Sequence, residues 1–408
     1  MSPSSATPTP SGRAALGLAR YAPGLHFEVA QSGRPAVERP LNGVPLFVGY
    51  AAVGGATARR MPPALEVSGW EHFHACFDVP ERGLLSRAVQ GFFANGGSLC
   101  AVHAVPGAPE EAGPAGLGQA FDAGGPLEEV TGIDLVCVPD AVAQGDDAAE
   151  PLQRLQARVL EHCERMGDRF ALLDAPATST SARLEALQGH AGNLRSPFGA
   201  LYFPWLQVEP ATFARPALVV PPCGHIAGVY ARTDARVGVH KAPANEVVDG
   251  VLATQWSVDE AEHLALNDAG VNCIRASSGR GIRIWGARTL SGHAKWRYIP
   301  SARVHLALSR WLQQNLDDVV FEANTPELWR RVEQRIGAYC RDLFDVGALA
   351  GRDRAGAYYV KCDAELNPPD SRDAGRLVAE VGLAISVPAE FVVVRIVHDA
   401  SGLVLTRP

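Results

Sequence analysis

Runs of hydrophobic residues predict many short strands along the chain. Polar and apolar residues alternate over 25–29, which is typical of a strand with one buried face. Further strands, rich in apolar and β-branched residues, are predicted at 44–50, 99–105, 133–138, 170–173, 271–275, 282–285, 377–385 and 391–397, and that at 133–138 is expected to be buried. Because strands recur through the whole length, we expect at least one large sheet.

Helical spacing of apolar residues predicts helices between several of these strands. Residues 152–166 repeat Leu, Val and Cys at intervals of three and four, and 84–94 ends at Asn95-Gly96-Gly97, a helix stop. Ser257-Val258-Asp259-Glu260 is interpreted as a capping box that opens a helix to about Asn267. Two further helices are predicted at 301–316 and 325–344, the second with Thr325 as N-cap and Pro326 in its first turn.

The order of elements predicts a mixed α/β fold. Strand 133–138, helix 152–166 and strand 170–173 have the lengths of a parallel βαβ unit. Residues 107–126 are interpreted as a surface loop with a helical turn near 117–121, and 212–256 as a loop-rich crossing between domains. The first 20 or so residues, rich in Ser, Pro, Thr and Ala, are expected to form a flexible arm.

Composition narrows the function classes. A chain of 408 residues with 47% hydrophobic residues is long enough for two domains. The net charge of −7 argues against a nucleic-acid partner, and no apolar stretch predicts a membrane span or a signal peptide. The eight cysteines form no CxxC pair and are expected to be buried free thiols. We therefore expect synthesis in the cytoplasm.

Motifs of enzymes and metal sites are weak. The chain has no GxxxxGK[ST], GxSxG or HExxH motif, and Gly279-Arg280-Gly281 is interpreted as a tight turn. Asp140 and Asp174 each follow a buried strand, where catalytic carboxylates often lie, but also where carboxylates cap helices. His72, His74 and Cys76 would share one face of a strand, yet a fourth zinc ligand is not evident. No cofactor or metal is expected.

Several long motifs resemble one protein family. They include VVPPCGHIAGVYARTD at 219–234, GVHKAPANE at 238–246, GRGIRIWGARTL at 279–290 and WRYI at 296–299. Shorter pieces in the same order are FVGY at 47–50, AVQGFFANGG at 88–97, ALYFPWL at 200–206 and FEANT at 321–325. Together they resemble the contractile tail sheath proteins of phages and related injection devices over about residues 24 to 397.

The resemblance implies a two-domain sheath fold with terminal arms. In that picture 1–23 is the flexible arm, 24–44 with 216–390 forms an inner domain, 45–215 is the inserted outer domain, and 391–408 is a C-terminal strand or arm. The implied function is a subunit that polymerises helically around a tail tube and contracts. The implied partners are further copies of the chain, the tube, baseplate and terminator proteins, and a sheath-recycling ATPase, within a phage tail or injection particle.

The resemblance leads to expectations for two sets of residues. The arm strands, expected to pair with neighbouring copies by strand addition, contain Leu25, Phe27, Val29, Phe391, Val393, Arg395 and Val397. The family-signature residues, expected to be structural, are Pro221, Pro222, Gly224, Gly228, Arg232, Asp234, Gly238, Lys241, Pro243, Asn245, Asn267, Asn272, Arg280, Trp285, Arg288, Tyr298, Asn324 and Trp329. Two alternatives remain open: an α/β enzyme using Asp140 or Asp174, and a non-contracting sheath-like cap of the same particle.

Overall fold

The computed structural model describes residues 40–408 except 55–61, 81–82, 142–148, 178–182, 211–215, 317, 320–321, 386–390, 400–401 and 407–408. The predicted arm at 1–23 and the predicted strand at 25–29 lie outside the described residues. Residues 38–408 form one compact unit. In the described part, no helix has the length and apolar character that crossing a membrane requires.

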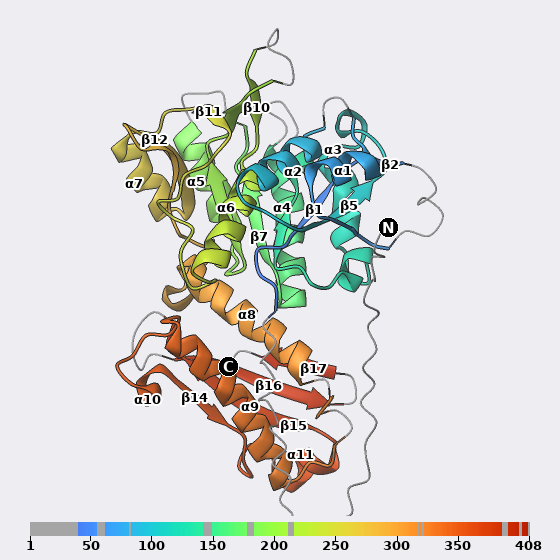
Figure 1. Cartoon of the computed structure of the whole chain (residues 1–408), viewed down its shortest axis with the longest axis vertical. Helices are drawn as coiled ribbons and strands as arrows, with labels where there is room; N and C mark the ends of the chain where they lie inside the picture. The colour runs from blue at the N-terminus through green and yellow to red at the C-terminus, as the bar shows by residue number, and fades with distance from the viewer. Residues whose placement is uncertain are drawn as a thin grey trace, which may run out of the picture. The chain divides into compact units, whose positions relative to one another are not determined.

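An eight-stranded sheet organises most of the chain (Figure 1). Its strand order is β13-β12-β8-β7-β6-β1-β5-β3. The bounds are β1 Pro45–Tyr50, β3 Leu65–Val67, β5 Cys100–Val105, β6 Leu135–Cys137, β7 Phe170–Asp174, β8 Gly199–Phe203, β12 Val271–Ser277 and β13 Gly281–Trp285. The six strands from β5 to β12 in this order pair in parallel, and the antiparallel β3 and β13 close the two edges. Every residue of β1, β7 and β8 is buried; strands were predicted at β1 and β7, whereas β8 was not predicted.

Helices cover both faces of this sheet. The connections β1–α2–β5 and β6–α4–β7 run toward opposite edges, and right-handed crossovers place their helices on opposite faces. The helices of this part are α1 Trp70–Cys76, α2 Leu85–Ala94, α3 Pro109–Gly118, α4 Ala149–Met166, α5 Arg183–Asn193, α6 Cys223–Arg236 and α7 Glu260–Asp268. The predicted parallel βαβ unit is confirmed by the pairing of β6 with β7 around α4.

Two local predictions were wrong, and a third was right only in part. The stretch 212–256, interpreted as loop-rich, contains the 14-residue helix α6, ten of whose residues are buried. The capping box of α7 is made by Asp259 and Glu262 rather than by Ser257 and Glu260. At 107–126, the helical turn predicted near 117–121 is confirmed by the 3₁₀ turn Gln119–Phe121, but the rest of the expected loop contains α3, which is interrupted at Gly113 (φ 52°).

Two small sheets complete this part of the chain. One has the order β10-β9-β11, with bounds Leu218–Val220, Leu206–Val208 and Val251–Thr254, and the other pairs β2 Ala52–Val53 with β4 Phe77–Asp78. The large sheet itself continues past the predicted domain boundary at 215/216, because β12 pairs with β8. The division into inner and outer domains stays a prediction.

The C-terminal part is a four-stranded antiparallel sheet packed on a helix (Figure 1). Its order is β14 Tyr358–Lys361, β15 Leu377–Leu383, β16 Val392–Asp399 and β17 Gly402–Thr406. Helix α9, Pro326–Asp345, contacts β14 and β15, while α10 Arg354–Ala357 and α11 Pro369–Asp373 are single turns. The predicted N-cap of α9 is confirmed, since the Thr325 hydroxyl accepts from the N–H of Leu328 at 3.4 Å.

Helix α8, Ile299–Asn315, lies between these two parts and is buried over most of its length. Its Trp311 ring stacks on Tyr339 of α9 at 4.6 Å, and Phe198, next to β8, stacks on His305 at 5.9 Å. Helix α8 therefore packs against the large sheet through one set of side chains and against α9 through another.

Candidate assembly surfaces and their buried supports

The two strand-end carboxylates cap helices. Asp140, 2% exposed, accepts the backbone N–H of Tyr50 at 2.8 Å and that of Leu84, the N-cap of α2, at 2.5 Å. Asp174, 4% exposed, accepts the N–H of Cys223, the first residue of α6, at 2.8 Å. Burial raises the pKa of Asp174 to about 7, and the hydrogen bonds from Cys223 oppose this rise. Each carboxylate lies at a helix N-terminus that it stabilises, away from solvent.

The His72, His74 and Cys76 set lies on α1, not on a strand as the sequence analysis supposed. Residues two apart on a helix face different directions, so the three side chains cannot converge on one metal ion in the expected way. His74 packs edge-on against Trp70 at 4.2 Å, and His72 accepts the N–H of Ser68 at 3.4 Å. In the part of the chain that the structure describes, no three His, Cys, Asp or Glu side chains are grouped as metal ligands would be.

The signature residues are spread over consecutive elements of the large sheet and its helices. Pro221 and Pro222 precede α6, and the α6 residues include Gly224, Gly228, Arg232 and Asp234. The remaining ones are placed as follows: Gly238, Lys241, Pro243 and Asn245 between α6 and β11, Asn267 on α7, Asn272 on β12, Arg280 in the β12–β13 turn, Trp285 on β13, Arg288 and Tyr298 between β13 and α8, Asn324 before α9, and Trp329 on α9.

Gly224 and Gly228 allow α6 to pack directly on α2. A Cβ atom on Gly224 would clash with the backbone of Ala88, and one on Gly228 would clash with the carbonyl of Phe92. The two glycines are one helical turn apart and therefore face α2 together. Sequence reasoning named these residues but missed their helix.

Asp234 belongs to a buried ion network that fixes α8 to the large sheet. The Arg303 guanidinium of α8 donates to both carboxylate oxygens of Asp234, at 2.7 and 2.6 Å, and to Asp134 at 2.6 Å. Burial lowers the pKa of Arg303, but the carboxylates of Asp234 and Asp134 more than reverse that effect, so Arg303 stays charged. Two helical turns further along α8, Arg310 donates to the carbonyl of Asp168 at 2.5 Å.

The side chains of Asn324 and Trp329 form a hydrogen-bonded pair at the start of α9. The Trp329 indole N–H donates to the Asn324 side-chain oxygen at 2.5 Å, and the Asn324 amide donates to the carbonyl of Arg376 at 2.9 Å. Asn324 thereby joins the start of α9 to the start of β15. This pair has a structural role in the single chain.

The C-terminal sheet offers the strands that the arm prediction concerns. Val393, Arg395 and Val397 lie on β16, and Phe391 directly precedes it. In the single chain β16 is an interior strand, paired with β15 on one side and with β17 on the other. Among the described residues, β14 and β17 each pair with one strand only, so they are the edges of this sheet. The pairing of arm residues with a second copy stays a prediction.

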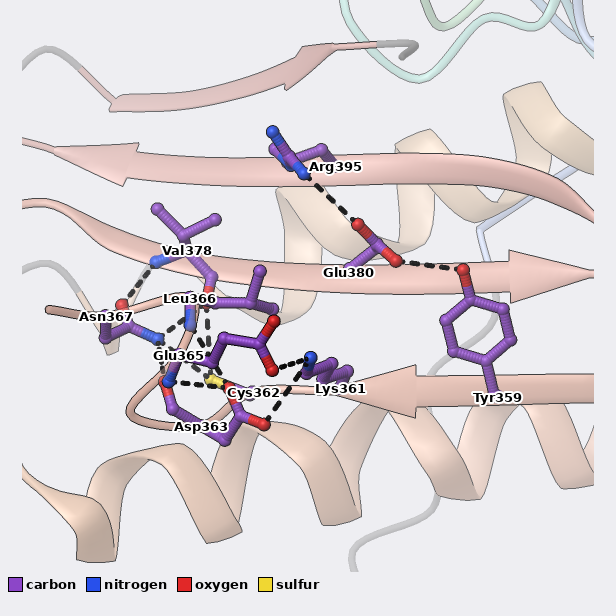
Figure 2. Close-up of polar contacts among 10 residues, drawn as sticks. All are labelled: Tyr359, Lys361, Cys362, Asp363, Glu365, Leu366, Asn367, Val378, Glu380 and Arg395. Carbon is purple, nitrogen blue, oxygen red and sulfur yellow. Dashed lines mark hydrogen bonds and ion pairs between the residues drawn. The ribbon is translucent and has the colours of Figure 1, made fainter.

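Side-chain contacts link neighbouring strands of this sheet and close part of one edge (Figure 2). Glu380 accepts the Tyr359 hydroxyl at 2.9 Å and lies 3.4 Å from the Arg395 guanidinium, which links β14, β15 and β16. Beyond the end of β14, no strand pairs with this edge of β15 in the described residues, and the side-chain amide of Asn367 pairs with the β15 backbone instead. It accepts from the N–H of Val378 and donates to its carbonyl, both at 2.8 Å. This edge of β15 is therefore closed beyond β14.

Comparison with known proteins agrees with the sheath resemblance. The family model described as phage tail sheath protein central domain matches residues 119–290. A putative prophage major tail sheath protein of Pseudomonas aeruginosa (strain UCBPP-PA14) is 27% identical over 228 residues, which cover 54% of this chain and 55% of the relative. The match thus spans about half the length of this curated relative.

Solved structures match over nearly the whole chain. A chain of the anti-feeding prophage helical sheath in the contracted state has 30% sequence identity and a TM-score of 0.69, with 92% of this chain and 98% of that chain covered. A chain of the anti-feeding prophage baseplate has 29% identity and a TM-score of 0.70, with the same coverage of 92% and 98%. With a conserved fold, 30% identity and end-to-end coverage, the protein belongs to the contractile tail sheath family of phages and contractile injection systems.

Proposed function

We propose that this chain is the repeating subunit of a contractile sheath, which polymerises helically around a tail tube and contracts to drive the tube through a target envelope. The observation that carries the proposal is the match, over 92% of the chain, to a subunit of a helical sheath in its contracted state. The proposal gives Asp140 and Asp174 no catalytic role, because both are buried helix caps.

The subunits would be linked by strand addition at the C-terminal sheet. The edges β14 and β17 carry backbone groups that a strand from another copy can pair with. The N-terminal segment Leu25, Phe27 and Val29 supplies one such strand in the proposal. The hairpin containing Phe391, Val393, Arg395 and Val397 supplies the other by domain swapping, in which the contacts of β16 with β15 are remade between copies.

Contraction requires no nucleotide in this proposal. Backbone hydrogen bonds between copies persist while each subunit rotates, and the contracted lattice is favoured because it buries more surface between subunits. At ~25 cal/mol per Å² of apolar surface, a few hundred Å² of extra burial per subunit would release several kcal/mol, multiplied over all copies. The expected partners are the tube, baseplate and terminator proteins, and an ATPase that recycles contracted sheath.

The test is assembly of the purified chain, alone and with its tube protein, observed by negative-stain electron microscopy. We expect wide hollow tubes. A chain that stays monomeric at high concentration in both conditions would contradict the proposal.

A second candidate is a sheath-like subunit located at the baseplate, which does not itself contract. The observation that favours it is the 29% identical chain in a baseplate structure. Quantitative mass spectrometry of purified particles separates the two functions. The main proposal requires many copies per particle, whereas one or a few rings of copies would favour the baseplate subunit.

A further inference from the structure

A polar pocket lies where the end of α7, the loop between α5 and β8, and the segment between β13 and α8 meet. Its volume is about 280 Å³, and its lining includes three arginines, Arg195, Arg288 and Arg297, together with Asp268 and Ser291. Arg288 and Arg297 lie within the family motifs at 279–290 and 296–299, and Arg195 lies outside them. The pocket is unrelated to the buried carboxylates and to the C-terminal sheet.

The backbone around the pocket is held rigidly. Asn272, fully buried on β12, donates to the carbonyl of Arg288 and accepts from its N–H, both at 2.8 Å. Thr289 donates through its hydroxyl to the carbonyl of Trp296 at 2.6 Å and through its N–H to the carbonyl of Arg297 at 2.9 Å. The segments that carry Arg288 and Arg297 are thereby tied together, so the pocket is formed before any partner arrives.

The arginine side chains retain unused hydrogen-bonding capacity. Within the described residues, neither the Arg195 nor the Arg297 side chain has a hydrogen-bond or ion-pair partner. Arg288 stacks on the Tyr298 ring at 5.4 Å, and its Nη2 lies 4.0 Å from the Asp268 carboxylate, which is 84% exposed. An exposed carboxylate at that distance neutralises little of the charge, so the pocket keeps a positive surplus.

We propose that this pocket receives one or more carboxylate side chains from a second copy of the chain, and that this contact helps to assemble the sheath. Guanidinium groups bind carboxylates through paired hydrogen bonds, which suits unpaired arginines on a rigid frame. A second copy fits because the chain carries 44 acidic residues against 37 basic ones. The exposed Tyr298 ring, at 47%, adds an apolar contact beside the ion pairs.

The inference rests on the proposed sheath function, because the partner is another subunit. A pocket of this volume holds one or two side chains, and it therefore fits a local protein contact rather than an extended polyanion. Charge pairs at the rim of an interface chiefly set its orientation and its salt dependence. In a helical array this contact would fix the register of one subunit on the next.

The first experiment measures the concentration at which tubes form, by sedimentation and negative-stain microscopy. For Arg195→Glu/Arg297→Glu we expect the concentration to rise at least about tenfold at low salt. The matched control is Arg154→Glu/Arg158→Glu on α4, which makes the same change of charge at exposed positions away from the pocket. Circular dichroism and thermal unfolding check that both variants fold.

A second experiment identifies the contact directly. Arg297→Lys keeps the positive charge and provides an amine that a carbodiimide couples to a touching carboxylate. With ¹⁴N- and ¹⁵N-labelled subunits mixed, we expect a cross-link from position 297 to an Asp or Glu of the other isotope in assembled material, and none in the monomer fraction.

Three outcomes distinguish a failure of the proposed sheath function from a failure of the proposed pocket contact. If the wild-type chain stays monomeric, the proposed function fails and this contact fails with it. If wild-type tubes form and the pocket variant assembles like wild type, or both double variants are impaired equally, the pocket has no specific role although the sheath function stands. Cross-links confined to one isotope would likewise overturn the pocket contact.

Discussion

At the residue scale, polar groups that sequence reasoning marked as candidate chemistry turn out to support the fold. The clearest cases are Asp140 and Asp174, which accept backbone N–H groups at the starts of helices. A further buried support, which the sequence analysis did not name, is Arg303, which binds two buried carboxylates from different elements. The sequence marked Asp234 through its family motif, but nothing local indicated that its partner lies 69 residues later on α8. Long-range pairing of this kind depends on the tertiary fold, so one sequence alone could not reveal it.

Arg303→Met is expected to destabilise the chain by about 3–5 kcal/mol, because it leaves Asp134 and Asp234 buried without their counter-ion. The free energy of unfolding, measured by urea titration, tests this. The control Arg330→Met removes an exposed pair with Glu327 and should cost no more than ~1 kcal/mol. Equal, small losses in the two variants would contradict the assigned role of the network.

Buried histidines should make the fold sensitive to acid. Burial lowers the pKa of His190 to about 4, and its Nε2 hydrogen-bonds Gln156. Since an unfolded histidine titrates near ~6.5, the unfolded chain binds more protons below that pH, and stability falls as the pH drops from about 6.5 toward 4.

Between pH 7 and 5 this one histidine should account for about 2 kcal/mol of lost stability. We expect His190→Gln to lose correspondingly less than the wild type over that range, in urea unfolding at each pH. Parallel curves for the two proteins would show that His190 does not contribute.

At the element scale, hydrophobic patterns predicted most strands and several helices, but the elements that were missed depend on tertiary packing. Strands β1, β5, β7 and β12 and helices α2, α4 and α9 lie close to their predicted ranges. Helix α6 was missed because Pro221 and Pro222 before it and Gly224 and Gly228 within it suggested a loop, whereas those glycines allow its close contact with α2. Strand β17 was missed although Gly402 followed by Leu403-Val404-Leu405 is a turn-and-strand signal.

Gly224→Ala should destabilise the protein by more than about 2 kcal/mol, because α6 would have to move away from Ala88 on α2. The matched control is Gly189→Ala on α5, where an added Cβ meets no atom within 4 Å. That change should stabilise the helix by about 0.5–1 kcal/mol. Thermal unfolding measures the change in stability of both variants. Similar changes at the two sites would contradict the close α2–α6 contact.

At the scale of the whole molecule, the proposed function depends on how one copy joins the next. Family membership followed from the ordered motifs and is confirmed by end-to-end structural similarity. The partners of the chain ends did not follow from the sequence, because a strand that pairs within its own copy and one that pairs with a neighbour have the same pattern. In the single chain β16 already has two partners, which the sequence analysis had not foreseen.

Truncation tests the two proposed arms separately. Removing residues 386–408 deletes the proposed C-terminal hairpin, β16 and β17, and leaves β14 and β15 paired with each other on α9, so we expect a folded, soluble subunit. Removing residues 1–30 deletes the proposed N-terminal strand. Each truncated chain should fail to form tubes in negative-stain images while keeping the circular dichroism of the full chain. Normal tubes from both truncations would refute the arm model.

The most direct measurement is a cryo-electron microscopy map of the assembled tube, at a resolution that traces each strand. The account predicts that the C-terminal sheet of every copy contains at least one strand contributed by a neighbouring copy, from residues 25–29 or from the hairpin that includes β16. A map in which all strands of that sheet come from a single copy, with both chain ends paired only inside it, would contradict the account.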